Sequence, residues 1–301
     1  MSITTNLDLK SLFPDIVDPR AVEHGLVRKT LIDKITTFTI PCEGDVPSVL
    51  VPYAPLEPEV GFVKEGAEIP SAEAQLHEAV IHTGKVATIQ ELSWEAIRQN
   101  YQPGVAYEQA TDPIATNAVA NSTAGKILLK NLSNAIARKT NDALLNNTSP
   151  LGAKGLLTLE GIQDAGTLEE GNLDAISDAI SMVEAELGTP THIVIDPLSW
   201  GKLRKTKTAA NAGTLLLGSA VDETPSTLFG VEVVVAPEMP KGTALVLDKN
   251  HILSSYGKLI LSCSQDAAFT RDSVIARMTW RFGATALYPK HIAKVTIPVA
   301  K

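Results

Sequence analysis

Two glutamates in the segment GFVKEGAEIP (residues 61–70) are the first candidates for chemistry in this sequence. Glu65 and Glu68 stand three residues apart, and paired carboxylates can serve as a general acid and a general base. The glycines and the closing proline predict a flexible, solvated stretch, which would not bury either carboxylate as a general acid at neutral pH requires. We therefore expect no acid–base catalysis from this pair.

Histidines and cysteines form no recognisable metal site or nucleophile either. The six histidines are scattered, and the closest pair, His77 and His82, would point to opposite faces of a predicted strand. Cys42 and Cys263 are far apart and fit buried, reduced thiols better than a disulfide framework. The sequence contains no GxSxG, phosphate-loop, CxxC or HExxH pattern. We expect no catalytic, cofactor-binding or metal-binding residues, and a protein that is not an enzyme.

Composition and charge argue against membrane-spanning, secreted and nucleic-acid-binding proteins. The 301 residues are 44% hydrophobic, but no apolar run reaches the roughly 18 residues of a membrane span, and the N-terminus has no secretory signal. The formal net charge is -8, with 34 acidic and 26 basic residues, and aromatic residues make up 5%. A sequence-reading DNA-binding protein carries a basic surface, and a single-strand binder carries aromatic platforms, so we expect neither.

The first 90 residues predict an arm followed by a hairpin that leaves the body. Residues 1–45 are irregular and proline-punctuated, which suggests a loose tail or an arm that packs on something else. Two extended pieces, VPSVLVPYA and HEAVIHTGKVATI, flank an acidic, proline-bearing connection that includes residues 61–70. A long structureless loop inside a compact domain is unusual, and a projecting hairpin accounts for it.

Helical patterns dominate the next part of the chain. SWEAIRQN (residues 93–100) predicts a short helix with Ser93 as its N-cap. Residues 114–147 predict a long helix with Leu128, Leu132 and Ile136 on its buried face, and Gly125 is a candidate kink. Its predicted polar sides carry Lys130, Asn134, Arg138 and Asn141.

The rest of the chain predicts an α/β unit and a long strand. Within residues 171–257 we expect a helix ending at Gly188, a strand at 192–196, and a second helix with Asp196 as N-cap and Pro197 at its first position. Two more strands follow, after a loop at 207–227 with the composition of a mobile segment. Residues 274–286 alternate strictly, with apolar side chains at even positions, which predicts a strand about twice the usual length.

This order of parts resembles the major capsid proteins of tailed bacteriophages, the Hong Kong phage capsid fold that encapsulins share. GFVKEGAEIP looks like the aromatic-Val-x-Glu-Gly-x-x-Ile-Pro signature of that family's extended loop. Four further segments are similar to the family's strand-to-helix join, its axial (A) domain and its peripheral (P) domain: KVATIQELSWEAI, THIVIDPLSWGKLRK, LFGVEVVVAPEMPKGTALVLD and WRFGATALYPKHIAKVTI. The resemblance covers the chain from about residue 40.

The resemblance implies an α+β fold with four parts. These are an N-terminal arm (1–45), an extended-loop hairpin with its flanking strands (46–90), a peripheral domain with the spine helix (91–170 and 258–301) and an axial domain (171–257). It also implies intersubunit contacts of the extended loop, made by Phe62, Val63, Lys64, Glu65 and Glu68.

The implied function is that of a shell subunit. Copies would form the hexamers and pentamers of an icosahedral virion capsid, assembled in the host bacterial cytoplasm, with the loop at 207–227 near the symmetry axes. The implied partners are copies of the chain itself, scaffolding, portal and decoration proteins, and packaged double-stranded DNA held without sequence-specific binding; no membrane and no cofactor are implied. Because the chain begins with Met1 and shows no charge-rich helical extension before the arm, we expect a separate scaffold rather than a processed product.

Some members of the family cross-link a loop lysine to an asparagine of a neighbour, with help from a glutamate. Lys64 could stand for that lysine, and Lys85 less plausibly, but the sequence has no Asn after Asn250 and no Glu after Glu238. We therefore expect no autocatalytic cross-linking. Two other readings stay open at this point, an encapsulin-type compartment shell and, more remotely, a soluble enzyme whose site is unrecognised.

Overall fold

The structure, a computed structural model, describes residues 30–42, 44, 46–54, 62–66, 76–98, 113–169, 172–206 and 227–298. Its elements in chain order are α3 (Leu31–Ile35), β1 (Thr37–Phe38), β2 (Ser48–Tyr53), β3 (His77–His82), β4 (Gly84–Ser93), α4 (Trp94–Arg98), α5 (Pro113–Asn121), α6 (Thr123–Asn146), η1 (Leu156–Thr158), β5 (Gln163–Thr167), α7 (Asp174–Ala185), β6 (His192–Ile195), α8 (Pro197–Lys205), β7 (Thr227–Leu228), β8 (Val231–Val235), β9 (Thr243–Leu247), η2 (Lys249–His251), β10 (Ile252–Tyr256), β11 (Ile260–Ser264), η3 (Asp266–Arg271), β12 (Ser273–Ala286), η4 (Pro289–His291) and β13 (Ile292–Thr296).

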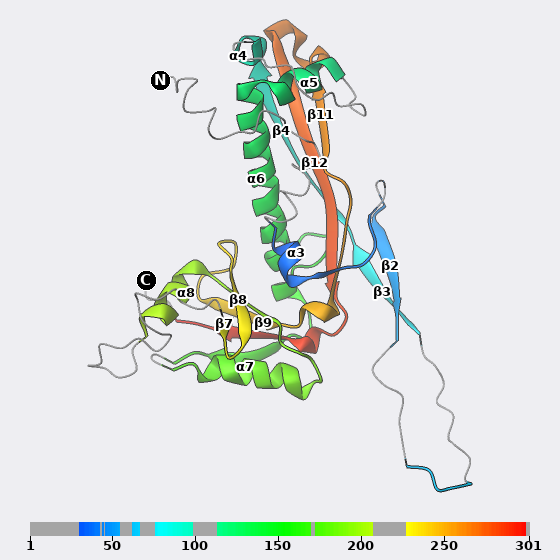
Figure 1. The fold of residues 1–301 in the computed structure, drawn as a ribbon, viewed down its shortest axis with the longest axis vertical. Helices are drawn as coiled ribbons and strands as arrows, with labels where there is room; N and C mark the ends of the chain where they lie inside the picture. Colours follow the sequence, from blue (N-terminus) through cyan, green and yellow to red (C-terminus); the bar gives the residue numbers. More distant parts are fainter. Residues whose placement is uncertain are drawn as a thin grey trace.

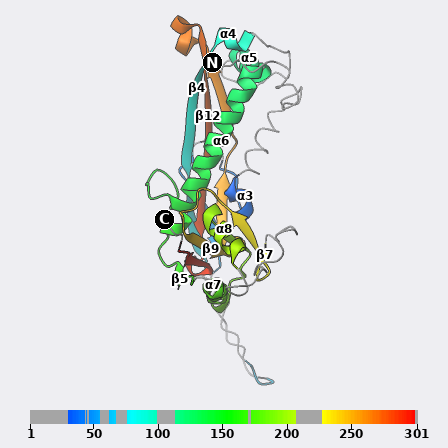
Figure 2. The ribbon, with the colours of Figure 1, turned by 90° about the vertical axis from the view of Figure 1, so that its left-hand side faces the viewer.

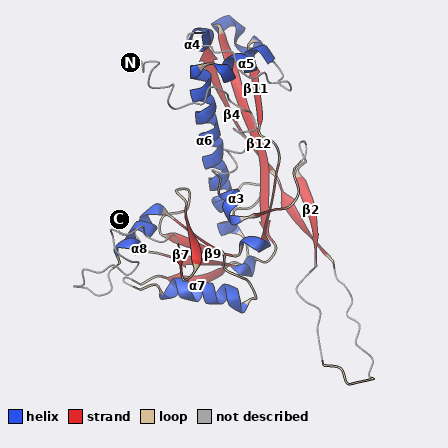
Figure 3. Cartoon of the chain, viewed as in Figure 1, coloured by secondary structure: helices blue, strands red, loops and turns tan. Residues whose placement is uncertain are grey.

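A long helix and a long strand run side by side through the upper half of the molecule. Figure 1 shows α6 parallel to the ribbon of β4, β12 and β11, and the turned view in Figure 2 confirms that the helix lies against this sheet. At about 1.5 Å per residue, the 24 residues of α6 extend for roughly 36 Å. α7, α8, β7 and β9 lie together below α6 in Figure 3, at the lower left.

β12 is the centre of a five-stranded sheet in which β1, β10, β12 and β11 follow one another and β4 also pairs with β12. The predicted alternation in this strand is confirmed at the even positions from 274 to 284, because Val274, Ala276, Met278, Trp280, Phe282 and Ala284 are all buried. Ala286 is only half-buried, and Thr279 on the opposite face is buried as well. Burying one large apolar side chain contributes about 1.5–3 kcal/mol. The indole Nε1 of Trp280 donates a hydrogen bond to the carbonyl oxygen of Gly257 at 2.8 Å, so this buried ring has no unpaired polar atom.

The second sheet has six strands in the order β5-β13-β9-β6-β8-β7. The strands of this sheet do not all come from the range predicted for the axial domain, residues 171–257. β5 and β13, placed by the sequence in the peripheral part, pair within this sheet, whereas β10, placed in the axial part, pairs with β12. The reason is that the chain passes from the five-stranded sheet to the six-stranded sheet between β4 and β5, returns through η2 between β9 and β10, and crosses again through η4 between β12 and β13.

The long predicted helix is two helices, and the break lies at Ser122 rather than at Gly125. Ser122 has an extended backbone, and its Oγ accepts a hydrogen bond from the N–H of Gly125 at 2.9 Å, which caps the N-terminus of α6. A Cβ on Gly125 would lie 1.7 Å from the carbonyl oxygen of Val119. Glycine is therefore needed just after the break, because the preceding helix returns against it.

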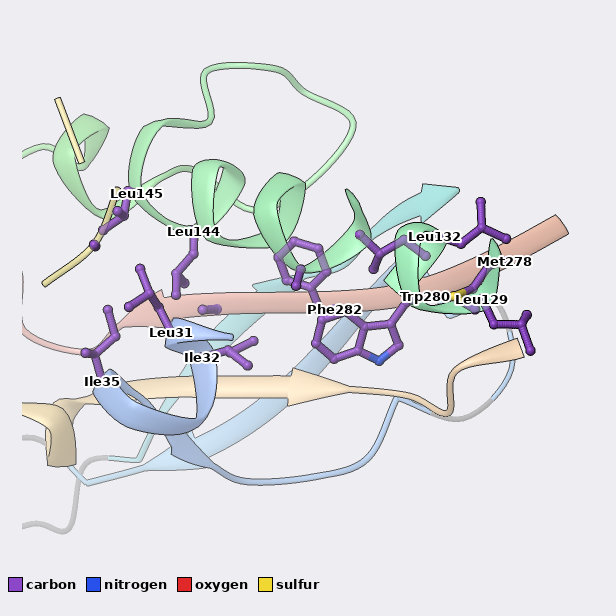
Figure 4. Close-up of a cluster of buried hydrophobic side chains, with 14 of the residues drawn as sticks. Leu31, Ile32, Ile35, Leu129, Leu132, Leu144, Leu145, Met278, Trp280 and Phe282 are labelled. Carbon is purple, nitrogen blue, oxygen red and sulfur yellow. The ribbon is translucent and has the colours of Figure 1, made fainter. Parts of the chain in front are cut away.

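The predicted arm is not irregular throughout, because its end forms α3 and β1. Leu31, Ile32 and Ile35 are buried, and Figure 4 shows them facing Leu144 of α6. The backbone N–H of Leu31 donates to Oδ1 of Asn141 at 2.8 Å. Asn141 was predicted on a polar side of the helix; instead it is buried, since it satisfies the N-terminus of α3. Among the described residues, no helix is both long and apolar enough to cross a membrane.

Candidate assembly surface

The hairpin of β2 and β3 is largely exposed, with one buried residue, Ile81. The two strands pair antiparallel from Ser48 opposite His82 to Tyr53 opposite His77, and they form a separate two-stranded sheet. An isolated two-stranded hairpin is marginally stable in water, so it needs another surface to cover one face. In Figure 1 it extends away from both sheets of the body.

The base of the hairpin is fixed to β12. Ile81 is fully buried, and the carbonyl oxygen of His82 approaches Gly283 so closely that a Cβ there would lie 2.2 Å from it. Arg281 of β12 donates through Nη1 to the carbonyl oxygen of Val46 at 3.1 Å and to Oγ1 of Thr83 at 3.0 Å. These contacts set the direction in which the hairpin leaves the body.

Apolar side chains remain uncovered farther along the strands. Leu50 lies directly opposite Val80, and the two side chains are 54% and 39% exposed. Leu76, just before β3, is 77% exposed. Such cross-strand apolar pairs stabilise a sheet when they pack against something. The sequence alone did not single out these three residues, because the two pieces were recognised only by their extended, β-branched composition.

Four of the five predicted contact residues, Phe62 to Glu65, lie at the far end of the hairpin. Residues 62–66, the short cyan segment at the bottom of Figure 1, lie apart from the body. Phe62 is fully exposed, Val63 is 40% exposed, and Lys64 and Glu65 are exposed as well. Gly66 has φ +78°, a conformation that favours glycine and turns the chain. Glu68 lies outside the described residues, as do residues 207–226 of the loop predicted at 207–227; Thr227 begins β7.

The tryptophans and cysteines of the described residues occupy positions in or against the cores. Trp200 and Trp280 are buried, Trp94 packs on the main core, and Cys42 and Cys263 are buried. His77 and His82 are exposed. The structure does bring three potential metal ligands together, however, because Asp248, His251 and His291 place their ligand atoms within 4.8 Å of one another. Sequence reasoning missed this cluster, since His291 lies 40 residues from His251 and no spacing motif connects them.

Among the described residues, the side chains with a shifted pKa are His192 in β6, Tyr256 in β10 and Asp142 in α6. Burial lowers the pKa of His192, although Glu232 opposes the effect. Burial also raises the pKa of Tyr256. The pKa of Asp142 is lowered, mainly by its hydrogen bond from Lys139 at 2.7 Å. These groups perturb local stability, and none of them is on β2 or β3.

The comparisons with known proteins agree with the fold. A family model described as the phage capsid family matches residues 22–297. The chain belongs to the phage capsid family. It is therefore a structural capsid subunit and not an enzyme, and the predicted α+β capsid fold is confirmed. No curated protein matches the sequence.

Solved capsid structures share the fold of this capsid subunit at low sequence identity. The capsid of a native GTA particle superposes with a TM-score of 0.64 at 18% identity, covering 90% of this chain and 91% of that one. A chain from Gordonia phage Cozz gives a TM-score of 0.65 at 17% identity, with 100% and 96% coverage. A chain from Microbacterium phage Oxtober96 gives 0.65 at 14% identity, with 99% and 100% coverage. The similarity thus extends over at least 90% of this chain and of each of the three solved chains.

Proposed function

We propose that this capsid subunit assembles with copies of itself into hexamers and pentamers of an icosahedral shell. In this proposal the hairpin of β2 and β3 lies across an adjacent subunit, and residues 62–66 with Glu68 contact it. The observation that carries the proposal is the hairpin itself, which leaves the body with an uncovered apolar pair and a fully exposed Phe62 at its far end.

Physical chemistry favours an intersubunit role for these side chains. Covering Phe62, Leu76, Leu50 and Val80 would contribute about 1.5–3 kcal/mol for each side chain that becomes fully buried. A hairpin on one face that fits a different face of the next copy makes a head-to-tail contact, and such contacts close into rings. Lys64 and Glu65 would then pair with charges of the neighbour or remain in water at the rim of the contact.

The shell would enclose double-stranded DNA without reading its sequence. The net charge of -8 supports a shell that does not bind the packed DNA tightly, since binding to phosphates requires basic side chains. We propose that assembly takes place in the host bacterial cytoplasm and that scaffolding, portal and decoration proteins are further partners. The mature location is the capsid of the virion.

The proposal is tested by substitutions at the far end of the hairpin. Phe62→Ser removes the exposed apolar contact, and the charge reversals Lys64→Glu and Glu65→Lys change the polar part of it. Because these residues are exposed, each variant should keep the unfolding midpoint of the unassembled subunit. Particle yield by electron microscopy and the melting temperature of assembled particles should both decrease.

Phe62→Leu is the matched control, because it keeps an apolar side chain at the same position. Its particle yield should stay close to that of the wild type. If Phe62→Ser and both charge reversals give particles in unchanged yield with unchanged melting temperature, the assignment of this segment to an intersubunit contact is wrong. A wild-type chain that stays monomeric under all assembly conditions would contradict the shell as well.

A further inference from the structure

Three side chains that bind metal ions in other proteins meet where the chain passes between the two sheets. Asp248 follows β9, His251 ends η2 just before β10, and His291 ends η4 just before β13. Nδ1 of His251 is 2.9 Å from Oδ2 of Asp248 and 3.0 Å from Nδ1 of His291. The two crossings are also hydrogen-bonded to each other, from the N–H of Leu287 to the carbonyl oxygen of His251 at 2.9 Å.

The outer contacts of the cluster orient its ligand atoms inward. Nε2 of His291 is 2.9 Å from the carbonyl oxygen of Glu186, which can only accept, so Nε2 carries the proton. In the neutral ring Nδ1 therefore presents its lone pair to His251. Asp248 accepts from the N–H of Thr189 through Oδ2 and from the N–H of Asn250 through Oδ1. Outer hydrogen bonds of this kind fix the ring orientation and tautomer of metal-binding histidines.

Two of the three residues are buried, which distinguishes this cluster from groups of acidic and histidine side chains on a protein surface. Asp248 is 1% exposed and His291 is 2% exposed, whereas the side chain of His251 is 29% exposed and gives access from solvent. Two imidazoles and one carboxylate are a donor set that Zn²⁺ and similar ions accept, with water completing the coordination. In a tetrahedral site with bonds of about 2.1 Å, ligand atoms lie roughly 3.4 Å apart, so the two separations from Nδ1 of His251 must widen by about 0.4–0.5 Å. The third pair of ligand atoms lies within 4.8 Å.

We propose that Oδ2 of Asp248 and the Nδ1 atoms of His251 and His291 bind one divalent transition-metal ion, with Zn²⁺ as the reference ion. The ion would join the two crossings to each other and, through Glu186 and Thr189, to the chain that follows α7. In this proposal the proton of His251 moves from Nδ1 to Nε2, so that Nδ1 can bind the ion while the ring stays neutral. No oxidation or reduction is involved. The bound ion would stiffen the joint between the two sheets.

The test uses the full chain, freed of metal by a chelator and titrated with Zn²⁺ by calorimetry. We expect one ion per chain and a higher melting temperature in the presence of Zn²⁺. His251→Gln and His291→Gln each remove one ligand and should weaken binding about 100-fold or more, since even outer partners of a metal site are worth 10–100-fold. His192→Gln is the matched control, because His192 pairs with Glu232 at 3.6 Å outside the cluster and its loss should leave the affinity unchanged.

Co²⁺ provides a second readout that does not depend on any variant. Four-coordinate Co²⁺ absorbs visible light much more strongly than the hydrated ion, so stoichiometric binding at this site should produce an intense visible band. Circular dichroism shows whether each variant remains folded. A wild-type chain that binds no Zn²⁺ and leaves Co²⁺ with the spectrum of the hydrated ion would overturn the proposal and leave a purely hydrogen-bonded cluster. Binding that persists unchanged in both cluster variants would also overturn it. Because the titration uses unassembled chains, neither outcome bears on the proposed shell.

Discussion

Replacing Gly283 with alanine tests how the body fixes the direction of the hairpin. Gly283 lies in β12 at the point where β3 crosses it, and its neighbour on that face is the carbonyl oxygen of His82. The substitution adds one methyl group at this crossing. It leaves every predicted contact residue of the hairpin unchanged, so any effect on assembly must come from position and not from lost contacts.

The size of the effect follows from the distances at this crossing. A Cβ on residue 283 would lie 2.2 Å from the carbonyl oxygen of His82 and 3.1 Å from Cγ2 of Ile81. Because real Cβ atoms essentially never come closer than 3.0 Å, β3 must move away by at least about 0.8 Å. Overpacking of this kind costs roughly 1–3 kcal/mol. Moving β3 away from β12 also strains the bonds from Arg281 to Val46 and Thr83.

Denaturant unfolding of unassembled subunits and particle counts by electron microscopy measure the two consequences. We expect Gly283→Ala to reduce the free energy of unfolding by roughly 1–3 kcal/mol and to reduce particle yield. Gly201→Ala is the matched control, because Gly201 lies inside α8 with no atom within 4 Å of the added Cβ. The control should stabilise the subunit by about 0.5–1 kcal/mol.

The reasoning is refuted if Gly283→Ala unfolds at the wild-type denaturant concentration and assembles in wild-type yield. That result would show that β3 can move from β12 without cost, and that the close approach does not set the direction of the hairpin. A loss of stability with normal assembly would confirm the crowding and contradict its link to the hairpin.

Three further predictions concern the cap of α8, a buried histidine and the chemistry of the shell. Asp196→Ala removes the acceptor of hydrogen bonds from Leu198, Ser199 and Gly242 and should cost about 2–4 kcal/mol in denaturant unfolding, whereas Asp196→Asn should cost less. Burial lowers the pKa of His192 in the folded state, so the unfolded chain binds a proton at this residue first as the pH falls below about 6.5. The free energy of unfolding should therefore decrease as the pH falls from there through the pKa of the folded state. His192→Gln should remove that part of the pH dependence. Intact particles boiled in SDS should run as single subunits without covalent ladders.

Local patterns in the sequence predicted several elements closely. Asp196 followed by proline predicted the start of α8, and both backbone N–H groups of that first turn indeed donate to its carboxylate. Ser93 accepts from the N–H of Ala96 at 3.4 Å, as expected of an N-cap. These features depend on residues within one turn of each other, so a single sequence contains the information. The alternation of β12 belongs to the same class, since a strand repeats every second residue.

Features that depend on distant residues were missed or misplaced. α3 has five residues, too few to show a repeating helical pattern in the sequence. The N–H of Leu31 at its N-terminus donates a hydrogen bond to Asn141, 110 residues away. The sequence predicted a kink at Gly125, whereas the break between the two helices lies at Ser122. Gly125 is required for another reason: the carbonyl oxygen of Val119 in α5 leaves no room for a side chain there.

The sequence by itself determined the order of the parts, the buried faces of α6 and β12, and a projecting hairpin with its exposed apolar and charged residues, because these depend on local periodicity and turn chemistry. Only the tertiary structure decided which strands share a sheet and which distant polar groups meet. The chain passes between the two sheets at η2 and η4, and these crossings bring His251 and His291 within 3.0 Å across 40 residues of sequence. Pairing between strands is set by packing of the whole chain, and no local pattern encodes it.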